Sequence, residues 1–511
     1  MLQALQQLPV LILGLGDSGL AMARWCVRHG ADVTVVDTRE TPPHLTLLQQ
    51  ACPQVVFKHA PMDAALVEGQ AIRAVFKSPG LSPESVAPVW QAAKAAGLWV
   101  GTELTLFAQA LENLKTDQQY APHVLAITGT NGKTTVTALT GQLLDRAGMR
   151  VAVAGNIGPT LLDTLTHAMQ SDVDQWPQAW VLELSSFQLD GVDNFAPTAA
   201  TVLNITQDHL DWHGTMEAYA EAKSRIFGPL GSMVLNREDA RVMAMMPAPV
   251  TKTKNNKQVP REIMCFSGDM PQQHGDWGLE SVNGMTWLVR ALDVDETRKS
   301  RASVDPEIYI QRLLPVDALR IRGRHNALNA MAALALAMTT GAPLAAMLYA
   351  LREYRGEPHR VASVAVLQNV EYIDDSKGTN VGATVAAIHS VGAERRIVAI
   401  LGGDGKGQDF SPLAAPVKKY VRSIVLIGQD ADALRQALQS AGVEMHDAAT
   451  LPEAVQCCQR LAHTGDAVLL SPACASLDMF TNYVQRGEVF AQAVQAMALE
   501  QGLAVDVWGG V

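Results

Sequence analysis

The chain has 511 residues, of which 48% are hydrophobic and 18% are charged, and its formal net charge is −11. This length exceeds what one hydrophobic core supports and predicts about three domains, while the acidic balance argues against a nucleic-acid-binding surface. Six scattered cysteines, no leader-like start and no apolar run of about 18 residues predict a cytoplasmic protein that neither enters nor crosses a membrane.

Strand and helix signals alternate over the first hundred residues. An apolar run at 10–13 precedes a helical pattern at 18–29, and further strands are expected at 33–37, 74–77 and 98–100. Repeated β–α units indicate a parallel sheet covered by helices. We therefore predict an α/β protein whose N-terminal domain, residues 1–103, is Rossmann-like.

A glycine-rich turn, Gly14-Leu-Gly-Asp-Ser-Gly19, connects the first expected strand to the first helix. It has the form G-x-G-x-x-G, and Asp37 ends the next strand at the expected distance of about 20 residues. Such a turn admits a diphosphate at a helix N-terminus, and the carboxylate can accept from a ribose hydroxyl. A nicotinamide dinucleotide, a UDP-sugar and a turn used only for packing all stay open here.

The second block, residues 104–356, contains the most informative segment, Gly129-Thr130-Asn131-Gly132-Lys133-Thr134-Thr135. It follows an apolar strand and opens a helix expected to end near Gly148. Glycines expose backbone N–H groups to phosphates, the lysine adds positive charge, and the neighbouring hydroxyl can reach Mg²⁺. The common phosphate-loop motif has four residues between its first glycine and the Gly-Lys pair, which would require a glycine where this chain has Ile127. The segment therefore fits a narrower variant of the motif. We predict a P-loop ATPase-like parallel-sheet domain that binds ATP or GTP.

Polar residues follow two further strands expected at 180–184 and 201–205. Glu183 interrupts an apolar strand, and a buried carboxylate is costly unless it is paired or metal-bound, which favours Mg²⁺ ligation. His209 and His213 are four residues apart, but the glutamate of zinc helices is missing, so we expect His209 to support the phosphate–metal site. Lys223, taken alone, is typical of an exposed helix lysine.

The pattern becomes irregular between residues 249 and 314. Polar stretches there predict a surface excursion without chemistry, containing a hairpin around 282–285. Regular structure is expected to resume at Arg324 with an alanine-rich helix.

The third block, residues 357–511, again alternates strands and helices. Strands expected at 370–373, 397–401, 423–427 and 467–470 indicate a second doubly wound sheet, so a C-terminal Rossmann-like domain is predicted. Two glycine-flanked lysines, Lys377 and Lys406, stand on separate loops and favour anion binding. Either one alone is also compatible with a glycine turn and a solvated lysine.

Together these segments resemble the Mur ligases of bacterial cell-wall synthesis. The resemblance covers nearly the whole chain and rests on residues 129–135, 155–158, 183–188, 204–209, 324–326 and 359–360. Segments 37–39, 78–80, 375–380 and 471–478 are most similar to members that add D-glutamate to UDP-N-acetylmuramoyl-L-alanine. The resemblance implies ATP-dependent amide-bond formation through an acyl phosphate in cytoplasmic peptidoglycan synthesis, which supports cell shape and division. It also implies successive domains for the UDP-sugar, ATP and the amino acid.

The resemblance further implies roles for single residues. The catalytic group would comprise Lys133, Lys223, His209 and Lys377. Two Mg²⁺ sites would involve Thr134, Glu183, His209 and Lys223, with Lys223 carbamylated. The nucleotide would be bound by Gly129, Thr130, Asn131, Gly132, Lys133, Thr134, Thr135, Asn326, Asn329, Arg360 and Asp375. The UDP-sugar would be bound by Gly14, Gly16, Asp17, Ser18, Asp37, Thr38, Arg39, Ser78, Pro79, Gly80, Asn156, Ser185 and Gln188, and D-glutamate by Thr379, Lys406, Ser476 and Tyr483.

Other function classes predict different behaviour. An NAD-dependent oxidoreductase has no need of the Lys-Thr-Thr loop, whereas a non-catalytic module would bind ATP without releasing phosphate. Another Mur or folylpolyglutamate-type ligase would use a different amino acid, and Lys406 and Ser476 argue against it. We expect a monomer whose domains close to assemble the site, with neither nucleic acid nor membrane as a partner.

Overall fold

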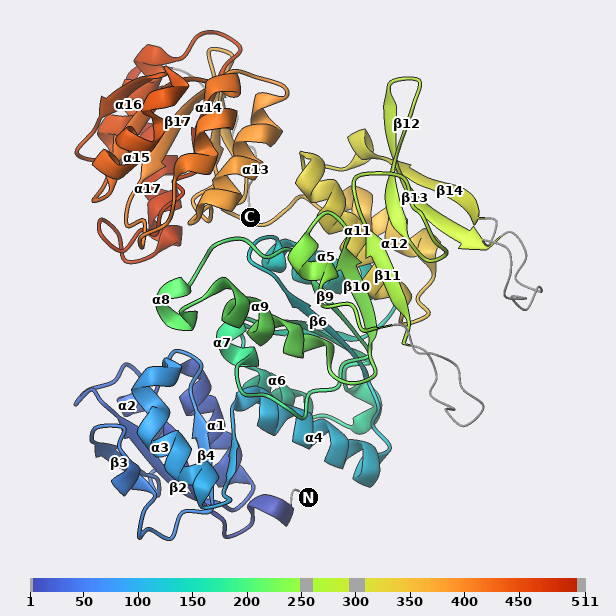
Figure 1. The fold of residues 1–511 in the computed structure, drawn as a ribbon, viewed down its shortest axis with the longest axis vertical. Coiled ribbons are helices and arrows are strands. Elements are labelled where there is room, and N and C mark those ends of the chain that lie inside the picture. Colours follow the sequence, from blue (N-terminus) through green and yellow to red (C-terminus); the bar gives the residue numbers. More distant parts are fainter. Residues whose placement is uncertain (1–2, 249–260, 294–307, 503–511) are drawn as a thin grey trace.

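The computed structural model describes residues 3–248, 261–293 and 308–502, and it contains three α/β domains in succession (Figure 1). Their sheets have five, nine and six strands. Short 3₁₀ helices occur at η1 Gln3–Leu5, η2 Ala64–Leu66, η3 Val173–Gln175, η4 Arg225–Phe227, η5 Val316–Ala318, η6 Ser411–Leu413 and η7 Gln439–Ala441. Within the described part of the chain, no helix combines the length and apolarity that a bilayer crossing requires.

The N-terminal domain is built on a parallel sheet of order β3-β2-β1-β4-β5. Its strands are β1 Pro9–Leu13, β2 Asp32–Asp37, β3 Val56–His59, β4 Ala74–Lys77 and β5 Trp99–Gly101, and its helices are α1 Asp17–Arg28, α2 Leu45–Ala51 and α3 Pro83–Ala95. The predicted parallel α/β arrangement is confirmed. Sequence periodicity missed β3 because this edge strand has no buried residue.

Gly19 packs directly against the glycine turn, because a Cβ at this position would lie 2.0 Å from the Gly14 carbonyl oxygen. We expect Gly19→Ala to lower the free energy of unfolding by about 1–3 kcal/mol, since overpacking forces α1 away from β1. Gly16→Ala is the matched control, since no atom lies within 4 Å of its added Cβ. Urea denaturation measures both, and equal stability of the two variants would contradict the close packing.

The central domain has a nine-stranded sheet of order β14-β13-β12-β11-β10-β9-β6-β8-β7. Its strands are β6 His123–Thr128, β7 Val151–Gly155, β8 Ala179–Glu183, β9 Ala199–Val202, β10 Ser232–Asn236, β11 Ile263–Phe266, β12 Trp277–Val282, β13 Met285–Asp293 and β14 Ile308–Pro315. Its helices are α4 Glu103–Gln118, α5 Lys133–Arg146, α6 Leu161–Ala168, α7 Ser186–Leu189, α8 Leu210–His213, α9 Met216–Ser224, α10 Ala240–Met243, α11 Arg324–Met338 and α12 Leu344–Glu353. Strands β6 to β12 pair in parallel, and the apolar runs predicted three of them, β6, β8 and β9.

The segment expected to be a surface excursion contributes structure to this sheet. The hairpin is confirmed, with β12 and β13 antiparallel across a tight turn, but β11 to β14 extend the central sheet and bury Phe266, Trp277 and Leu288. The polar stretch at 252–257, which was one reason for that expectation, lies outside the described residues. Partly exposed edge strands carry weak periodicity, which explains the wrong expectation.

The C-terminal domain has a six-stranded sheet of order β15-β16-β20-β17-β18-β19, parallel except for β15. Its strands are β15 Ala362–Leu367, β16 Val370–Asp374, β17 Ile397–Gly402, β18 Val421–Ile427, β19 Glu444–Asp447 and β20 Ala467–Leu470. Its helices are α13 Val381–Gly392, α14 Ala414–Tyr420, α15 Ala431–Leu438, α16 Leu451–Leu461 and α17 Tyr483–Glu500. The predicted second doubly wound sheet is confirmed.

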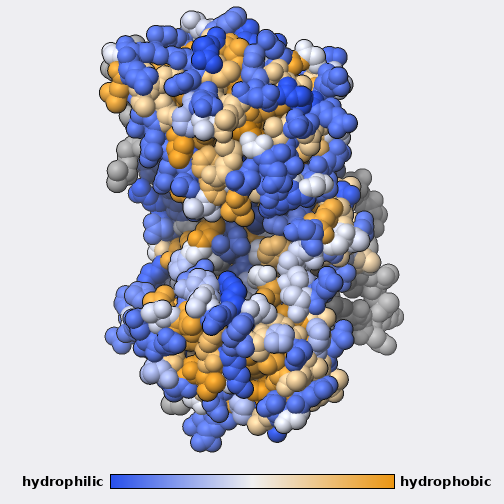
Figure 2. All heavy atoms as spheres, turned by 90° about the vertical axis from the view of Figure 1, so that its left-hand side faces the viewer, coloured by the Kyte–Doolittle hydropathy of each residue, from blue (hydrophilic) through white to orange (hydrophobic). Residues whose placement is uncertain are grey.

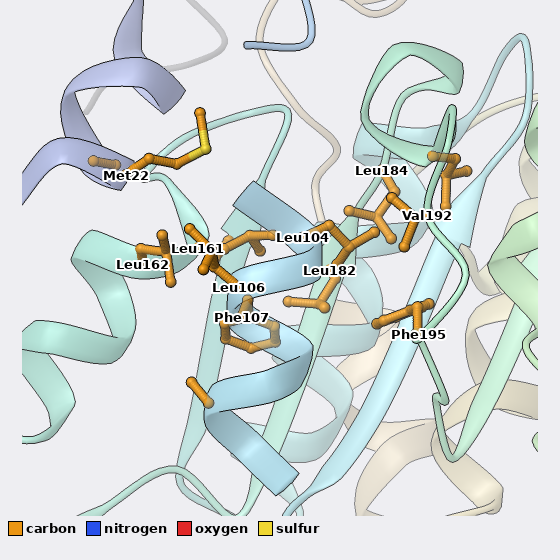
Figure 3. Close-up of a cluster of buried hydrophobic side chains, with 14 of the residues drawn as sticks. Met22, Leu104, Leu106, Phe107, Leu161, Leu162, Leu182, Leu184, Val192 and Phe195 are labelled. Atoms are coloured by element: carbon orange, nitrogen blue, oxygen red, sulfur yellow. The ribbon is translucent and has the colours of Figure 1, made fainter. Parts of the chain in front are cut away.

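One hydrophobic core joins the first two domains. Figure 3 shows Met22 of α1 near Leu161 of α6, beside Phe107 of α4 and Leu182 of β8. The cores of the C-terminal domain, in contrast, contain only residues beyond 360. The surface is hollowed between the C-terminal domain above and the N-terminal domain below (Figure 2). The C-terminal domain is therefore the one with a separate core, as expected of a domain that moves.

Candidate active site at the carboxyl ends of the central strands

The predicted phosphate loop connects β6 to α5 and passes close to neighbouring segments. Gly129 has φ +148° and Gly132 has φ +87°, conformations that favour glycine. A Cβ on Gly132 would lie 2.7 Å from Oδ1 of Asn329 in α11. The glycines thus allow the loop to approach α11 closely, with α5 beginning at Lys133.

The segment after β9 holds this loop in place. Asn204 Oδ1 accepts from the Asn131 backbone N–H at 2.8 Å, and Asn204 Nδ2 donates to the Asn131 carbonyl at 3.0 Å. The Thr130 hydroxyl lies 3.1 Å from both the Thr206 carbonyl and the Tyr219 hydroxyl. These contacts leave little freedom to the backbone around which a phosphate group would bind.

Lys133 folds over its own loop. Its Nζ donates to the Gly129 carbonyl at 2.9 Å and to the Thr130 carbonyl at 2.8 Å. Burial lowers the pKa of Lys133, and the Glu183 carboxylate opposes that shift. Beside it, the Thr134 hydroxyl accepts from Nη2 of Arg360 at 2.7 Å. Two cations from two domains therefore meet at the start of α5, as an anion site requires.

Glu183 has one carboxylate oxygen without a partner. The residue ends β8 and is 1% exposed, its Oε1 accepts from Asn156 Nδ2 at 2.9 Å, and its Oε2 is buried and unbonded. The described residues contain no group of three or more His, Cys, Asp and Glu side chains able to hold a metal ion. Mg²⁺ is usually held by one or two carboxylates together with substrate phosphates, and Glu183 fits that mode.

His209 and His213 do not form a zinc pair on one helical face. His209 precedes α8 with φ +53°, and His213 Nε2 lies 2.8 Å from the Ser186 hydroxyl. Burial lowers the pKa of His209, whose Nε2 lies 3.6 Å from the Asp208 carboxylate. A largely neutral imidazole next to a carboxylate is suited to metal ligation.

Lys223 is buried, contrary to the exposed position that its helix alone predicts. It is 1% exposed, and its Nζ donates to the Gly129 carbonyl at 2.9 Å and to the Thr128 hydroxyl at 3.2 Å. Burial, reinforced by Lys133, moves the pKa of Lys223 well below its ordinary value. The short helix α9 packs its lysine against the phosphate loop, a contact that no sequence periodicity encodes.

A pocket of about 200 Å³ lies between the central and C-terminal domains. Its lining includes Asn326 and Asn329 from α11 and Arg360, Asp375 and Lys377 from the C-terminal domain. Sequence reasoning did not assign a role to His325, which also lines it, and burial lowers the pKa of this imidazole to about 4. The other five residues were predicted from the family resemblance.

Two buried groups of this pocket have strongly altered acidity. Asp375 accepts from the Ser471 hydroxyl at 2.6 Å, and burial raises its pKa to about 7. Burial and the nearby Arg360 lower the pKa of Lys377 to about 8, and its ammonium lies 3.6 Å from the centre of the Tyr483 ring. At neutral pH, Lys377 thus keeps its charge beside the phosphate loop.

A pair of amides links the phosphate loop to the C-terminal domain. Asn131 Nδ2 donates to Asn380 Oδ1 at 3.2 Å, and Asn380 Nδ2 donates to Asn131 Oδ1 at 3.0 Å. Asn380 lies in a segment that sequence reasoning singled out without giving this residue a role. In the sequence, only its position next to Thr379, a predicted D-glutamate residue, pointed to Asn380.

Three predicted D-glutamate residues lie on connected segments. The loops that carry Lys406 and Ser476 pair through Asp404 and Ala475, whose backbone groups exchange hydrogen bonds of 3.1 and 2.8 Å. Lys406 is exposed and Ser476 is buried. Tyr483 begins α17, and its carbonyl accepts from the hydroxyl of Ser376 at 2.7 Å, three residues before Thr379.

The N-terminal domain presents its own polar cluster. Asp37 accepts from the Leu15 backbone N–H and from Arg39 Nε, both at 2.8 Å. Burial favours a higher pKa for Asp37, but these bonds outweigh it and lower the pKa to about 2. The Ser78 hydroxyl donates to the Gly14 carbonyl at 2.9 Å, so the loop at 78–80 lies against the glycine turn.

Two predicted N-terminal residues are engaged by protein partners. The Ser18 hydroxyl donates to Glu103 Oε2 at 2.6 Å, and burial raises the pKa of Glu103 to about 7. Asp17 pairs with His44 at 2.8 Å. Thr38, Arg39 and Gly80 are exposed. Asp37 and Ser78, both predicted for the UDP-sugar, therefore contact the glycine turn directly.

Comparisons with known proteins match all three domains. Family models described as "Mur ligase MurD-like, N-terminal domain", "Mur ligase middle domain" and "Mur ligase, glutamate ligase domain" match residues 9–101, 127–274 and 359–474. A protein of Albidiferax ferrireducens named UDP-N-acetylmuramoylalanine–D-glutamate ligase is 59% identical over 509 residues, covering 100% of this chain and 99% of the relative. A Polaromonas relative of the same name is 52% identical, covering 98% and 100%.

Solved structures are similar in fold at low sequence identity. MurF from Acinetobacter baumannii has a TM-score of 0.56 at 18% identity, covering 95% of this chain and 90% of that chain. A pseudomurein peptide ligase type C from Methanothermus fervidus has a TM-score of 0.53 at 16% identity, covering 96% and 99%. These two similarities support the three-domain architecture.

Proposed function

The chain belongs to the Mur ligase family, and on this basis we propose that it joins D-glutamate to UDP-N-acetylmuramoyl-L-alanine at the expense of ATP in peptidoglycan precursor synthesis. The observation that carries the proposal is the site at the start of α5. There, Lys133 donates to the loop backbone and Arg360 donates to Thr134. The unpartnered Oε2 of Glu183 lies at the end of the neighbouring strand β8. Relatives with this activity in their names match the chain along its whole length.

The first step would activate a carboxylate, which is a poor electrophile. An oxygen of the L-alanyl carboxylate would attack the γ-phosphorus of ATP, giving an acyl phosphate and ADP. Lys133, Arg360 and Lys377 would offset the negative charge that gathers on the transferred phosphoryl group. Mg²⁺ bound near Glu183 and Thr134 would supply further charge neutralisation on the triphosphate.

The second step would form the amide bond. The amine of D-glutamate would attack the acyl carbon, and the tetrahedral intermediate would expel inorganic phosphate. Lys377, still protonated near neutral pH because its pKa is about 8, would stabilise the departing phosphate. The loops of Lys406 and Ser476 would orient the amino acid, so that the reaction gains from positioning as well as charge.

We further propose a second Mg²⁺ site at His209 and a carbamylated Lys223. A buried lysine with a lowered pKa supplies the neutral amine that reacts with CO₂, and the carbamate then offers an oxygen ligand. We also propose domain limits of 1–103, 104–356 and 357–511, which agree with the three sheets. A cytoplasmic monomer that binds neither nucleic acid nor membrane completes the proposal.

A phosphate-release assay tests the function. UDP-N-acetylmuramoyl-L-alanine, ATP and Mg²⁺ would be combined with a panel of D- and L-amino acids, and the product would be identified by mass. D-glutamate should be the preferred acceptor. Preference for another amino acid would indicate a different ligase of the family, whereas NAD(H) binding without phosphate release would favour the oxidoreductase alternative.

A further inference from the structure

A buried cation that the proposed chemistry does not use lies between the first two domains. Lys77 ends β4, its side chain is 3% exposed, and its Nζ lies 2.9 Å from Oδ2 of Asp190. The ammonium also lies 5.6 Å from the ring centre of Trp90 in α3 and 5.5 Å from that of Trp212 in α8. One ion pair and two aromatic faces therefore stabilise a charge removed from water.

The ion pair joins two segments that are both predicted to bind the UDP-sugar. Lys77 directly precedes the loop at 78–80 in the N-terminal domain. Asp190 directly follows α7, whose capping box is formed by Ser185 and Gln188 in the central domain. Because each partner is anchored at the end of its element, the pair fixes the separation of that loop from α7.

The aromatic side of the contact extends toward the proposed metal site. The Trp212 ring lies 4.7 Å from that of Phe187, and the Phe187 ring lies 4.8 Å from that of His209. Lys77 thus touches a packed row of rings that ends at His209. A shift of the N-terminal domain would be transmitted to this row.

We propose that Lys77 is a positioning residue that, through Asp190, sets the separation between the loop at 78–80 and α7, the two segments that would bind the UDP-sugar substrate. The inference rests on the proposed function. The interaction matters for a ligand that spans both domains, because such a ligand is bound only when both segments are correctly spaced. UDP alone would bind only at the N-terminal turn, so its affinity should not depend on the ion pair.

The two partners are unequally buried, so their removal should have unequal effects. The Asp190 side chain is 26% exposed, whereas that of Lys77 is 3% exposed. Asp190→Asn leaves a buried, unpaired ammonium, but Lys77→Met leaves a carboxylate that water can reach while retaining the apolar stem. The double variant removes both charges and should resemble Lys77→Met.

Calorimetric binding to the full-length protein tests the proposal without any turnover. We expect Asp190→Asn to lower the affinity for UDP-N-acetylmuramoyl-L-alanine about tenfold and Lys77→Met to lower it less. The affinity for UDP should stay unchanged within about twofold in both variants. The double variant should bind better than Asp190→Asn. Lys94→Met is the control, since Lys94 is exposed over the same Trp90 ring, 6.0 Å from its centre.

Three outcomes would overturn the inference. The first is an unchanged affinity of Asp190→Asn for UDP-N-acetylmuramoyl-L-alanine. The second is an equal loss of affinity for this ligand and for UDP, which would indicate general damage to the fold. The third is a double variant whose loss of affinity equals the sum of the two single losses. Failure of the proposed function has a different signature, because the unmodified protein would then bind UDP-N-acetylmuramoyl-L-alanine without preference over UDP, or release no phosphate with D-glutamate.

Discussion

Replacing Lys133 by alanine is expected to abolish ATP-dependent ligation while leaving the fold intact. The lysine covers the phosphate loop, with its Nζ within 2.9 Å of two loop carbonyls, and a bound triphosphate would compete for the same ammonium. Loss of one such donor costs about 3–4 kcal/mol at a transition state, so the rate should fall by about 100- to 1,000-fold or more. Phosphate release under saturating substrates measures the loss.

The control for this variant is an alanine at Lys115. That lysine is on α4 with a side chain 61% exposed and pairs only weakly with Glu112 at 3.9 Å, so its removal should change neither rate nor stability. Thermal unfolding of both variants verifies the fold. Near-normal turnover by Lys133→Ala would remove the assignment of the phosphate loop.

The second large effect should follow loss of carbamate at Lys223. Carbamylation needs a neutral amine and CO₂, and the carbamate is lost when acid protonates it. Because burial moves the pKa of Lys223 well below that of an exposed lysine, a larger fraction of its amine is neutral at any given pH. The ligation rate should therefore fall as pH decreases in bicarbonate-depleted buffer and recover when bicarbonate is restored.

The variant Lys223→Arg distinguishes a need for the carbamate from a need for a positive charge at this position. Arginine keeps a cation near the Gly129 carbonyl but forms no carbamate, so the variant should be inactive with or without bicarbonate. A rate that is independent of bicarbonate in the unmodified protein, measured across mildly acidic pH, would argue against a carbamylated lysine. Mass spectrometry of the intact protein under CO₂ provides a direct check.

Domain movement is expected from how the C-terminal domain is attached. Its contacts with the phosphate loop are polar, through Asn131 with Asn380 and Thr134 with Arg360, and its hydrophobic cores are its own. The N-terminal and central domains instead share one core. Opening the pocket between the central and C-terminal domains would therefore break a few hydrogen bonds and the ion pairs of Arg322 with Glu371 and Glu394. Separating the first two domains would instead expose apolar surface.

Local order was predictable where the chain itself carries the cause. Apolar runs predicted β1, β6, β8 and β20, and the glycines around Lys133 predicted a tight loop before a helix, because strand periodicity and backbone freedom are properties of adjacent residues. The family motifs also predicted the pocket residues Arg360 and Lys377. Weakly periodic edge strands such as β3 and β14 escaped notice.

The amino-acid sequence by itself determined the three α/β domains and the glycine-rich loop between β6 and α5. Only the tertiary structure decided that Lys223 is buried, that Glu183 keeps one unpartnered oxygen, and that Lys77 meets Asp190 across two domains. The physical reason is that acidity, desolvation and ion pairing depend on what surrounds a group in space. Those surroundings come from residues tens to hundreds of positions away, which local patterns do not encode.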